Sequence, residues 1–323
     1  MDNIPHKALV VAYRLDGHGY GEPLSEAQIK ECWHDEKEML WMHFDLAAPN
    51  IEHYLASVAE LDSAQCEAMC EEAPRPRVAH FGQGMLTTLR GINTAPESDY
   101  DDLVSLRVFL SSRHLVTLRR RPLAPIQDIR EQLAQSVGPK SVTELLGALA
   151  DRIVDQMGDR FTALDEELSR LEEHQLDQDE LDSDALAELR RPLITLRRFM
   201  EPQYACLSRL AEATPGLENT TRLALRESAN QLYRYIEDVR AMQERALILQ
   251  EQTWNAHNEQ LNERLYQLSF ISVLFLPLTF LTGLLGINVG GMPGASDPHA
   301  FWVVVGLCVA LTIGLMVMMK RWR

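Results

Sequence analysis

The sequence predicts an α+β domain, resembling an α/β/α sandwich, followed by a long stalk helix and a two-helix transmembrane hairpin. Three observations predict this arrangement. Short segments rich in Val, Leu, Phe and Thr, bounded by turn residues, fill the first third of the chain. A stretch without proline runs from Gly216 to Pro277. Near the C-terminus, two apolar segments are each long enough to span a bilayer.

Length and charge set the outer limits. The 323 residues exceed one minimal domain, and the net charge of −16 argues against nucleic-acid binding, which needs clustered Lys and Arg. Between Leu265 and Met319 the only formal charge is Asp297, so an acidic domain precedes an apolar one. Much of the acid lies in residues 159–188, which we interpret as a solvated helix face, with a cation-concentrating surface as the alternative.

The first third predicts a mixed domain. IEHYLASVAELD and SAQCEAMCEEA are interpreted as helices. Residues 101–121 are expected to form a hairpin with Ser111-Ser112-Arg113 near its turn. The expected strand segments are KALVVAYRL, EMLWMHFDL, RVAHFGQGMLTTLRGI, LVSLRVFLSS and HLVTLRR.

From about residue 125 the pattern becomes helical. Ser141 and Glu144 have capping-box spacing and begin a helix that is expected to reach about residue 174. A second helix is expected to begin near Ser183, to be interrupted at Pro192 and Pro202, and to end near residue 214.

Residues 217 to about 285 are then compatible with one helix, about 100 Å long at 1.5 Å per residue. Such a helix cannot lie inside one globule, so it is expected to form a stalk or a bundle element.

The two apolar segments, 268–287 and 300–319, are predicted to cross the membrane. The connecting loop 288–299 has no Lys or Arg, whereas the tail 320–323 is KRWR. The positive-inside rule therefore places both termini in the cytoplasm. The expected divisions are a cytoplasmic α/β domain at 1–140, a helical hairpin at 141–216, a stalk at 217–267, and the two spans with their loop and tail.

Two helices cannot enclose an aqueous path, so a conducting form must be a homo-oligomer in which one helix per subunit lines the axis. Alternating steps of three and four residues along the stalk and first span select a narrow, uncharged, mostly small or polar stripe. Spacing alone is equally compatible with a packing seam of small residues. The stripe consists of Asn255, Asn258, Asn262, Leu265, Ser269, Ser272, Leu276, Thr279, Gly283 and Gly286.

At the outer end of the first span, Gly286 and Ile287 precede Asn288, and Asp297 and His299 lie at the mouth. Amide and carbonyl oxygens there suit a cation that keeps its water, because inner-shell ligands for Zn²⁺ are thiolate, imidazole or carboxylate. No inner-shell metal site and no cofactor are predicted. Cys66 and Cys70, one helical turn apart, are interpreted as partly buried thiols, with a zinc site as the alternative.

The Gly286-Ile287-Asn288 motif after the first of two C-terminal spans resembles the Gly-Met-Asn signature of the CorA metal-ion transporter superfamily. The stretch TGLLGINVGGMPG at 282–294 is similar to its ZntB zinc-transporting branch. Leu285, Ile287 and Gly294 depart from the CorA pattern and put magnesium transport in doubt. The resemblance implies that residues 286–288 form the selectivity region, and that the chain forms a funnel-shaped homopentamer that transports divalent metal.

The expected function is therefore uptake of zinc across a bacterial inner membrane, with proton coupling implied by the resemblance. No GxxxxGK[ST] loop is present, so no ATP is expected to be used, and no enzyme motif is found. The alternatives are a CorA-type Mg²⁺, Co²⁺ or Ni²⁺ channel, zinc efflux, and a membrane-anchored oligomeric scaffold.

Overall fold

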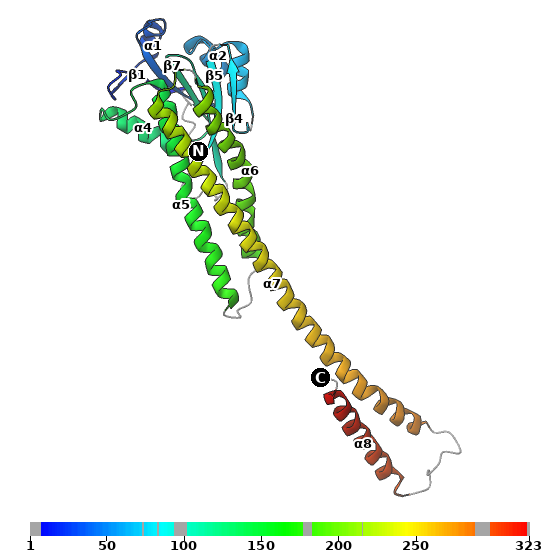
Figure 1. Cartoon of the computed structure of the whole chain (residues 1–323). Coiled ribbons are helices and arrows are strands. Elements are labelled where there is room, and N and C mark those ends of the chain that lie inside the picture. Colours follow the sequence, from blue (N-terminus) through cyan, green and yellow to red (C-terminus); the bar gives the residue numbers. More distant parts are fainter. Residues whose placement is uncertain are drawn as a thin grey trace. The chain divides into compact units, whose positions relative to one another are not determined.

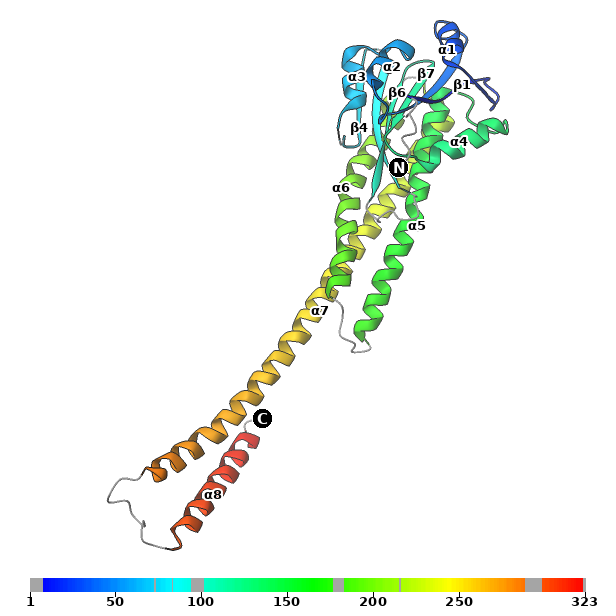
Figure 2. The same ribbon diagram turned by 180° about the vertical axis from the view of Figure 1, so that it is seen from behind.

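The computed structural model describes residues 8–72, 74–82, 84–93, 102–176, 183–214, 216–287 and 298–321. The chain divides into two units, Met1–Gln250 and Glu251–Arg323 (Figures 1 and 2). The first holds the sheet and most of the helices. The second holds the end of one long helix and a further apolar helix.

The first unit is built on one seven-stranded sheet in the order β2-β1-β3-β7-β6-β5-β4. Neighbouring strands pair antiparallel except β3 and β7, which are parallel and join the two antiparallel halves. The sheet is therefore mixed. The strands are β1 (Leu9–Leu15), β2 (Gly21–Pro23), β3 (Met39–Asp45), β4 (Arg77–Phe81), β5 (Gly84–Ile92), β6 (Leu103–Leu110) and β7 (His114–Arg119).

The predicted hairpin at residues 101–121 is confirmed as β6 and β7. The segment expected as a single strand at residues 77–92 is instead two antiparallel strands, with Phe81 opposite Gly84 at the reversal. A Cβ on Gly84 would come within 2.2 Å of the Phe109 ring, which explains the glycine at the start of β5. The three-residue β2 has no alternating pattern, and the sequence did not predict it.

Helices cover both faces of the sheet, which confirms the predicted sandwich. On one face, α1 (Glu26–Cys32), α2 (Ile51–Val58) and α3 (Ser63–Cys70) enclose a core with alternate residues of β3 such as Met42 and Phe44. On the other face, α4 (Ala124–Ala134) and three long helices share a second core with Trp41 and Leu115. The period-2 alternation of strand side chains separates the two cores.

A buried polar network joins the two halves of the sheet at the parallel pair. Trp41 Nε1 donates to Thr117 Oγ1 at 2.9 Å, and His43 Nδ1 lies 2.8 Å from the same oxygen. Arg119 Nε donates to His43 Nε2 at 3.0 Å, so Nε2 is an acceptor and the neutral ring carries its proton on Nδ1. Burial holds the pKa of His43 well below its usual range. Thr117 thus accepts two N–H bonds and donates to the Met42 carbonyl at 3.1 Å.

Two long helices, α5 (Val142–Leu176) and α6 (Ser183–Ala213), pack on the second core. At the start of α5, the amide of Glu144 donates to Ser141 Oγ, while the Glu144 carboxylate accepts from the amide of Lys140. The expected interruptions of α6 are wrong, because the helix continues through Pro192 and Pro202. Each proline removes one backbone bond, and burial of neighbouring apolar side chains such as Leu193, which is fully buried, compensates.

The predicted single long helix is confirmed as α7, Asn219–Gly286, with 68 residues and Pro277 inside it. Within the first unit, one face of α7 is buried at helical spacing against the second core. Those buried residues are Thr221, Leu225, Ser228, Ala229, Leu232, Ile236, Val239, Met242, Ala246 and Leu249.

Candidate ion pathway

Two of the described helices, α7 and α8 (Ala300–Arg321), are long and apolar enough to cross a membrane. Within the second unit, α8 runs in the direction opposite to the end of α7 (Figures 1 and 2). The large apolar side chains of this unit are mostly exposed in the single chain, including Leu276 at 75% and Trp302 at 70%. Such an apolar surface is expected to lie in a lipid bilayer or against further copies of the chain, and not in water.

The predicted stripe lies on α7, and its members are exposed except Asn258, which is half-buried. Leu265 is 59% exposed. Flanking residues of α7 are also exposed, so exposure in one chain does not distinguish the stripe from its neighbours. Gly286 is the last residue of α7, and Ile287, 50% exposed, forms a bend directly after it. His299 lies in a turn just before α8. Asn288 and Asp297 lie outside the described residues.

Two hydroxyl groups of the apolar span have defined partners. Ser272 Oγ donates to the carbonyl of Leu268 at 2.9 Å, and Thr282 Oγ1 donates to that of Leu278 at 2.9 Å. A hydroxyl that gives its hydrogen to its own helix keeps both lone pairs to accept bonds from water. Pro277 has no N–H, so the carbonyl of Val273, four residues before it, lacks the usual helical donor. The span therefore presents oxygen acceptors without any charge.

The same steps of three and four residues continue the stripe backward into the first unit. There they select Glu237, Ala241, Glu244 and Ile248, then Glu251 just beyond it. All five are exposed, and the four in the first unit lie on the side of α7 opposite its buried face. Sequence reasoning missed these glutamates, although stepping backward from Asn255 finds them. One helix face thus passes from carboxylates to amides and then to hydroxyls.

The described residues hold no group of three or more His, Cys, Asp or Glu side chains that could bind a metal ion. The interpretation of Cys66 and Cys70 as partly buried thiols therefore fits this part of the chain better than a zinc site. Cys66 is buried with its Sγ 3.6 Å from the Leu61 carbonyl, and burial raises the pKa of Cys70 to about 11. Both thiols stay protonated at neutral pH, and thiolate is the form that binds metal.

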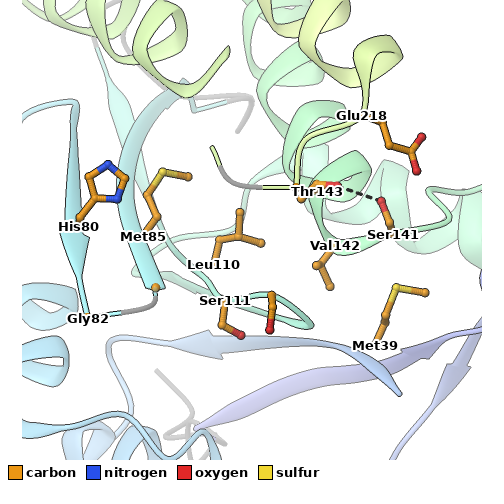
Figure 3. A pocket seen from close by; sticks show the side chains of 13 residues that line it. Met39, His80, Gly82, Met85, Leu110, Ser111, Ser141, Val142, Thr143 and Glu218 are labelled. Atoms are coloured by element: carbon orange, nitrogen blue, oxygen red, sulfur yellow. Dashed lines mark hydrogen bonds between the residues drawn. The ribbon is translucent and has the colours of Figure 1, made fainter. Parts of the chain in front are cut away.

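A cavity of about 410 Å³ lies where α5 and α7 begin, beside residues of β3, β4, β5 and β6 (Figure 3). Thioether, aliphatic and hydroxyl groups line it, and Ser141 and Thr143 hydrogen bond to each other at 3.1 Å. Its titratable side chains, His80 and Glu218, lie at opposite sides of the cavity in Figure 3. One imidazole and one distant carboxylate do not make an inner-shell zinc site, which needs three or four convergent ligands.

The sequence is similar to bacterial proteins that bear two names. It is 36% identical over 303 residues to the divalent cation transporter CmaX of Pseudomonas aeruginosa, covering 92% of this chain and 91% of the relative. It is 33% identical over 319 residues to the zinc transport protein ZntB of Pectobacterium atrosepticum, covering 98% and 96%. The expected resemblance to ZntB is confirmed.

The structure agrees with these matches along nearly the whole chain. It matches full-length CmaX with a TM-score of 0.84 at 34% identity, covering 99% of both chains. It matches the CorA magnesium transporter of Methanocaldococcus jannaschii with a TM-score of 0.81 at 18% identity, covering 97% and 98%, which shows a shared fold. The family model described as CorA-like Mg²⁺ transporter protein matches residues 36–321. The chain therefore belongs to the CorA-like family of transporter proteins.

Proposed function

We propose that this chain is one subunit of a homo-oligomeric transporter that carries divalent metal, zinc in the first place, across the bacterial inner membrane. The observation that carries the proposal is the uncharged stripe of α7, which lies in one of two apolar helices and continues into exposed carboxylates of the first unit. Membership of the CorA-like family supports transport, and similarity to proteins named ZntB supports zinc.

In the proposed assembly, α7 of each of five copies faces a common axis, with both termini of every chain in the cytoplasm. The ion stays hydrated on its way. Ser269, Ser272 and Thr279 offer oxygen acceptors to its water shell, and no charged group of the span replaces that shell. Rings formed by Leu265 and Leu276 serve as apolar constrictions that close by dewetting. At the outer end, Gly286, Ile287 and Asn288 select the ion through its water.

The membrane potential supplies the driving force for uptake in this proposal. Two positive charges moving inward gain about 4.6 kcal/mol per 100 mV of inside-negative potential, at roughly 2.3 kcal/mol per charge. The carboxylates of Glu237, Glu244 and Glu251 then attract the ion on the cytoplasmic side. Proton coupling is part of the proposal, but residues 265–287 contain no carboxylate or imidazole. Any coupling group must therefore lie outside that span, and His299 and Asp297 are the candidates.

Flux into proteoliposomes tests the proposal. Zinc, magnesium, cobalt and nickel are compared under an imposed voltage, with and without a pH gradient. Zinc entry that grows with inside-negative voltage supports the proposal, and acceleration by an inward proton gradient supports coupling. Large magnesium flux without zinc flux would contradict the proposal and favour a CorA-type magnesium channel, an alternative that the family description also names. Absence of flux for every metal would favour the membrane-anchored scaffold.

Two substitutions with a matched control test the stripe itself. Leu276→Ser is expected to raise zinc flux, because a hydroxyl keeps the constriction wet. Ile271→Ser makes the same kind of change at a 51% exposed position on another face of α7 and is expected to leave flux near the wild-type value. Asn288→Ala is expected to change the ratio of zinc to magnesium flux with folding intact. Equal effects of the two serine substitutions would refute the assignment of the stripe to the pathway.

A further inference from the structure

A basic groove lies between α6 and α7 on the surface of this acidic protein. It encloses about 800 Å³, and its lining includes four arginines, two glutamates and two partly exposed apolar side chains. Glu201 accepts from Arg197 at 3.1 Å and from Arg240 at 2.7 Å, and these contacts lower the pKa of its carboxyl. Arginines outnumber carboxylates, so the groove keeps a positive charge. The lining residues are Arg190, Ile194, Arg197, Arg198, Glu201, Arg240, Gln243, Glu244 and Leu247.

An acidic stripe lies on the outer face of α5. Asp155, Asp159, Glu166 and Glu173 follow one another at steps of four, seven and seven residues, and all four are exposed. They project from the side of the helix opposite buried residues such as Leu164. Asp155 accepts from Gln231 of α7 at 3.3 Å, and the other three carboxylates point away from the subunit's own core.

The groove and the stripe lie at the same level along the helices. Arg245 of α7 donates to Asp165 at 2.5 Å and to Glu172 at 2.6 Å, which places that part of α7 beside residues 165–172 of α5. A few residues earlier on α7, Gln243 accepts from Arg197 of α6 at 3.1 Å. If copies are related by rotation about an axis parallel to these helices, the groove and the stripe have the same height along that axis in every copy. Groove and stripe of neighbouring copies would therefore meet side by side.

The two surfaces also lie on opposite flanks. Arg245 faces α5 and Arg240 faces α6, and the exposed carboxylates Glu237 and Glu244 lie on the face of α7 between them. Figures 1 and 2 show α5 and α6 on opposite sides of α7 within the first unit. If that exposed face is turned to a common axis, the α6 flank of one copy is next to the α5 flank of its neighbour. Such a head-to-tail contact closes into a ring.

We propose that the basic groove between α6 and α7 binds the acidic stripe of α5 from a second copy of this chain. Ile194 and Leu247, 58% and 46% exposed in the single chain, become the apolar centre of the contact, and the charges form its rim. The proposal rests on the ring of subunits in the proposed function. In this proposal the acidic stripe binds a complementary basic surface, whereas from sequence alone we interpret the acidic segment as a solvated helix face.

Charge reversal in the full-length chain tests the contact. Among the described residues, neither Arg198 nor Glu166 forms an ion pair within the chain, so reversing them leaves the subunit's own ion pairs intact. The groove variant is R190E/R198E, the stripe variant is D159K/E166K, and the fourth protein combines all four changes. Arg209→Glu, an exposed arginine of α6 away from the groove, is the matched control.

Native mass spectrometry of the detergent-solubilised proteins measures the oligomer, and circular dichroism checks the fold. Each double reversal is expected to raise the concentration of half-dissociation by roughly tenfold, while the combined variant returns toward wild type. High salt should weaken the wild-type contact. Unchanged oligomers in every variant would overturn the interface but leave the ring and metal flux untouched, whereas a monomeric wild type with normal flux would overturn the ring itself. Loss of binding to phosphatidylglycerol vesicles by the groove variant, without any change in the oligomer, would assign the groove to lipid instead.

Discussion

Thr117→Val is expected to destabilise the first unit through the polar network at the parallel strand pair. Trp41, His43 and Thr117 are fully buried, so no water can replace the lost hydroxyl. Valine has a similar shape but accepts no hydrogen bond. The indole N–H of Trp41 and the Nδ1–H of His43 would both be left without an acceptor.

The structure sets the size of this effect. A buried donor without a partner costs about 1–3 kcal/mol, so two such donors cost roughly 2–6 kcal/mol. A loss near 3 kcal/mol lowers the unfolding midpoint of a unit of this size by roughly 6–12 °C. Thr117→Ser keeps the hydroxyl and removes only a methyl group, so a loss of about 1 kcal/mol is expected.

Thermal unfolding of the detergent-solubilised chain, followed by tryptophan fluorescence and near-ultraviolet circular dichroism, measures both variants. The valine variant should unfold well below the serine variant. If valine shifts the midpoint by less than about 2 °C, or if serine costs as much as valine, the network does not contribute in the way that its geometry indicates.

Three further predictions concern the first unit. Burial, with Arg113 nearby, lowers the pKa of His114 in the folded chain to about 4. The neutral ring therefore contributes fully to folding stability above the unfolded-state pKa near 6.5, and this contribution is lost as the pH falls toward 4. Between pH 6.5 and 4 the free energy of unfolding should fall by roughly 1–2 kcal/mol, after allowance for solvent at the half-buried ring. In His114→Gln this pH-dependent fall should be smaller. Gly147→Val should lower the unfolding midpoint by several degrees, because even a Cβ there would come within 2.7 Å of the buried Thr221 on α7, whereas valine at an exposed α5 position should not. Arg245→Met should cost about 1–2 kcal/mol in denaturant unfolding by removing its bonds to α5, and Arg245→Lys should recover only part of the loss.

Much of the fold follows from local sequence. Strands β3, β6 and β7 are predicted because they are short, apolar and bounded by turn residues, and α7 is predicted because no proline follows Gly216 until Pro277. The errors arise where tertiary packing decides. Pro192 and Pro202 read locally as breaks, but the buried face of α6 outweighs two lost backbone bonds. The reversal between β4 and β5 coincides with Gly82-Gln83-Gly84, a turn signal in the sequence that the interpretation of residues 77–92 as one strand overlooks.

The candidate pathway is predictable in part. Periodicity identifies the stripe and its continuation to Glu237, and the Gly286 motif indicates the family. Which face of α7 meets an axis depends on contacts between copies, and a single chain's periodicity is equally compatible with packing. The basic groove could not be predicted at all, because Arg198 and Arg240 are distant in sequence and meet only when α6 and α7 pack together.

The parallel pairing of β3 with β7 has a consequence for synthesis of the chain. Strands β1 to β3 can pair among themselves as soon as residue 45 has left the ribosome, but the free edge of β3 must wait for residues 114–119. During that interval a hydrophobic strand edge is open to wrong partners. Nascent chains stopped between residues 50 and 110 should therefore aggregate readily or be retained by chaperones, and chains that extend beyond β7 should escape.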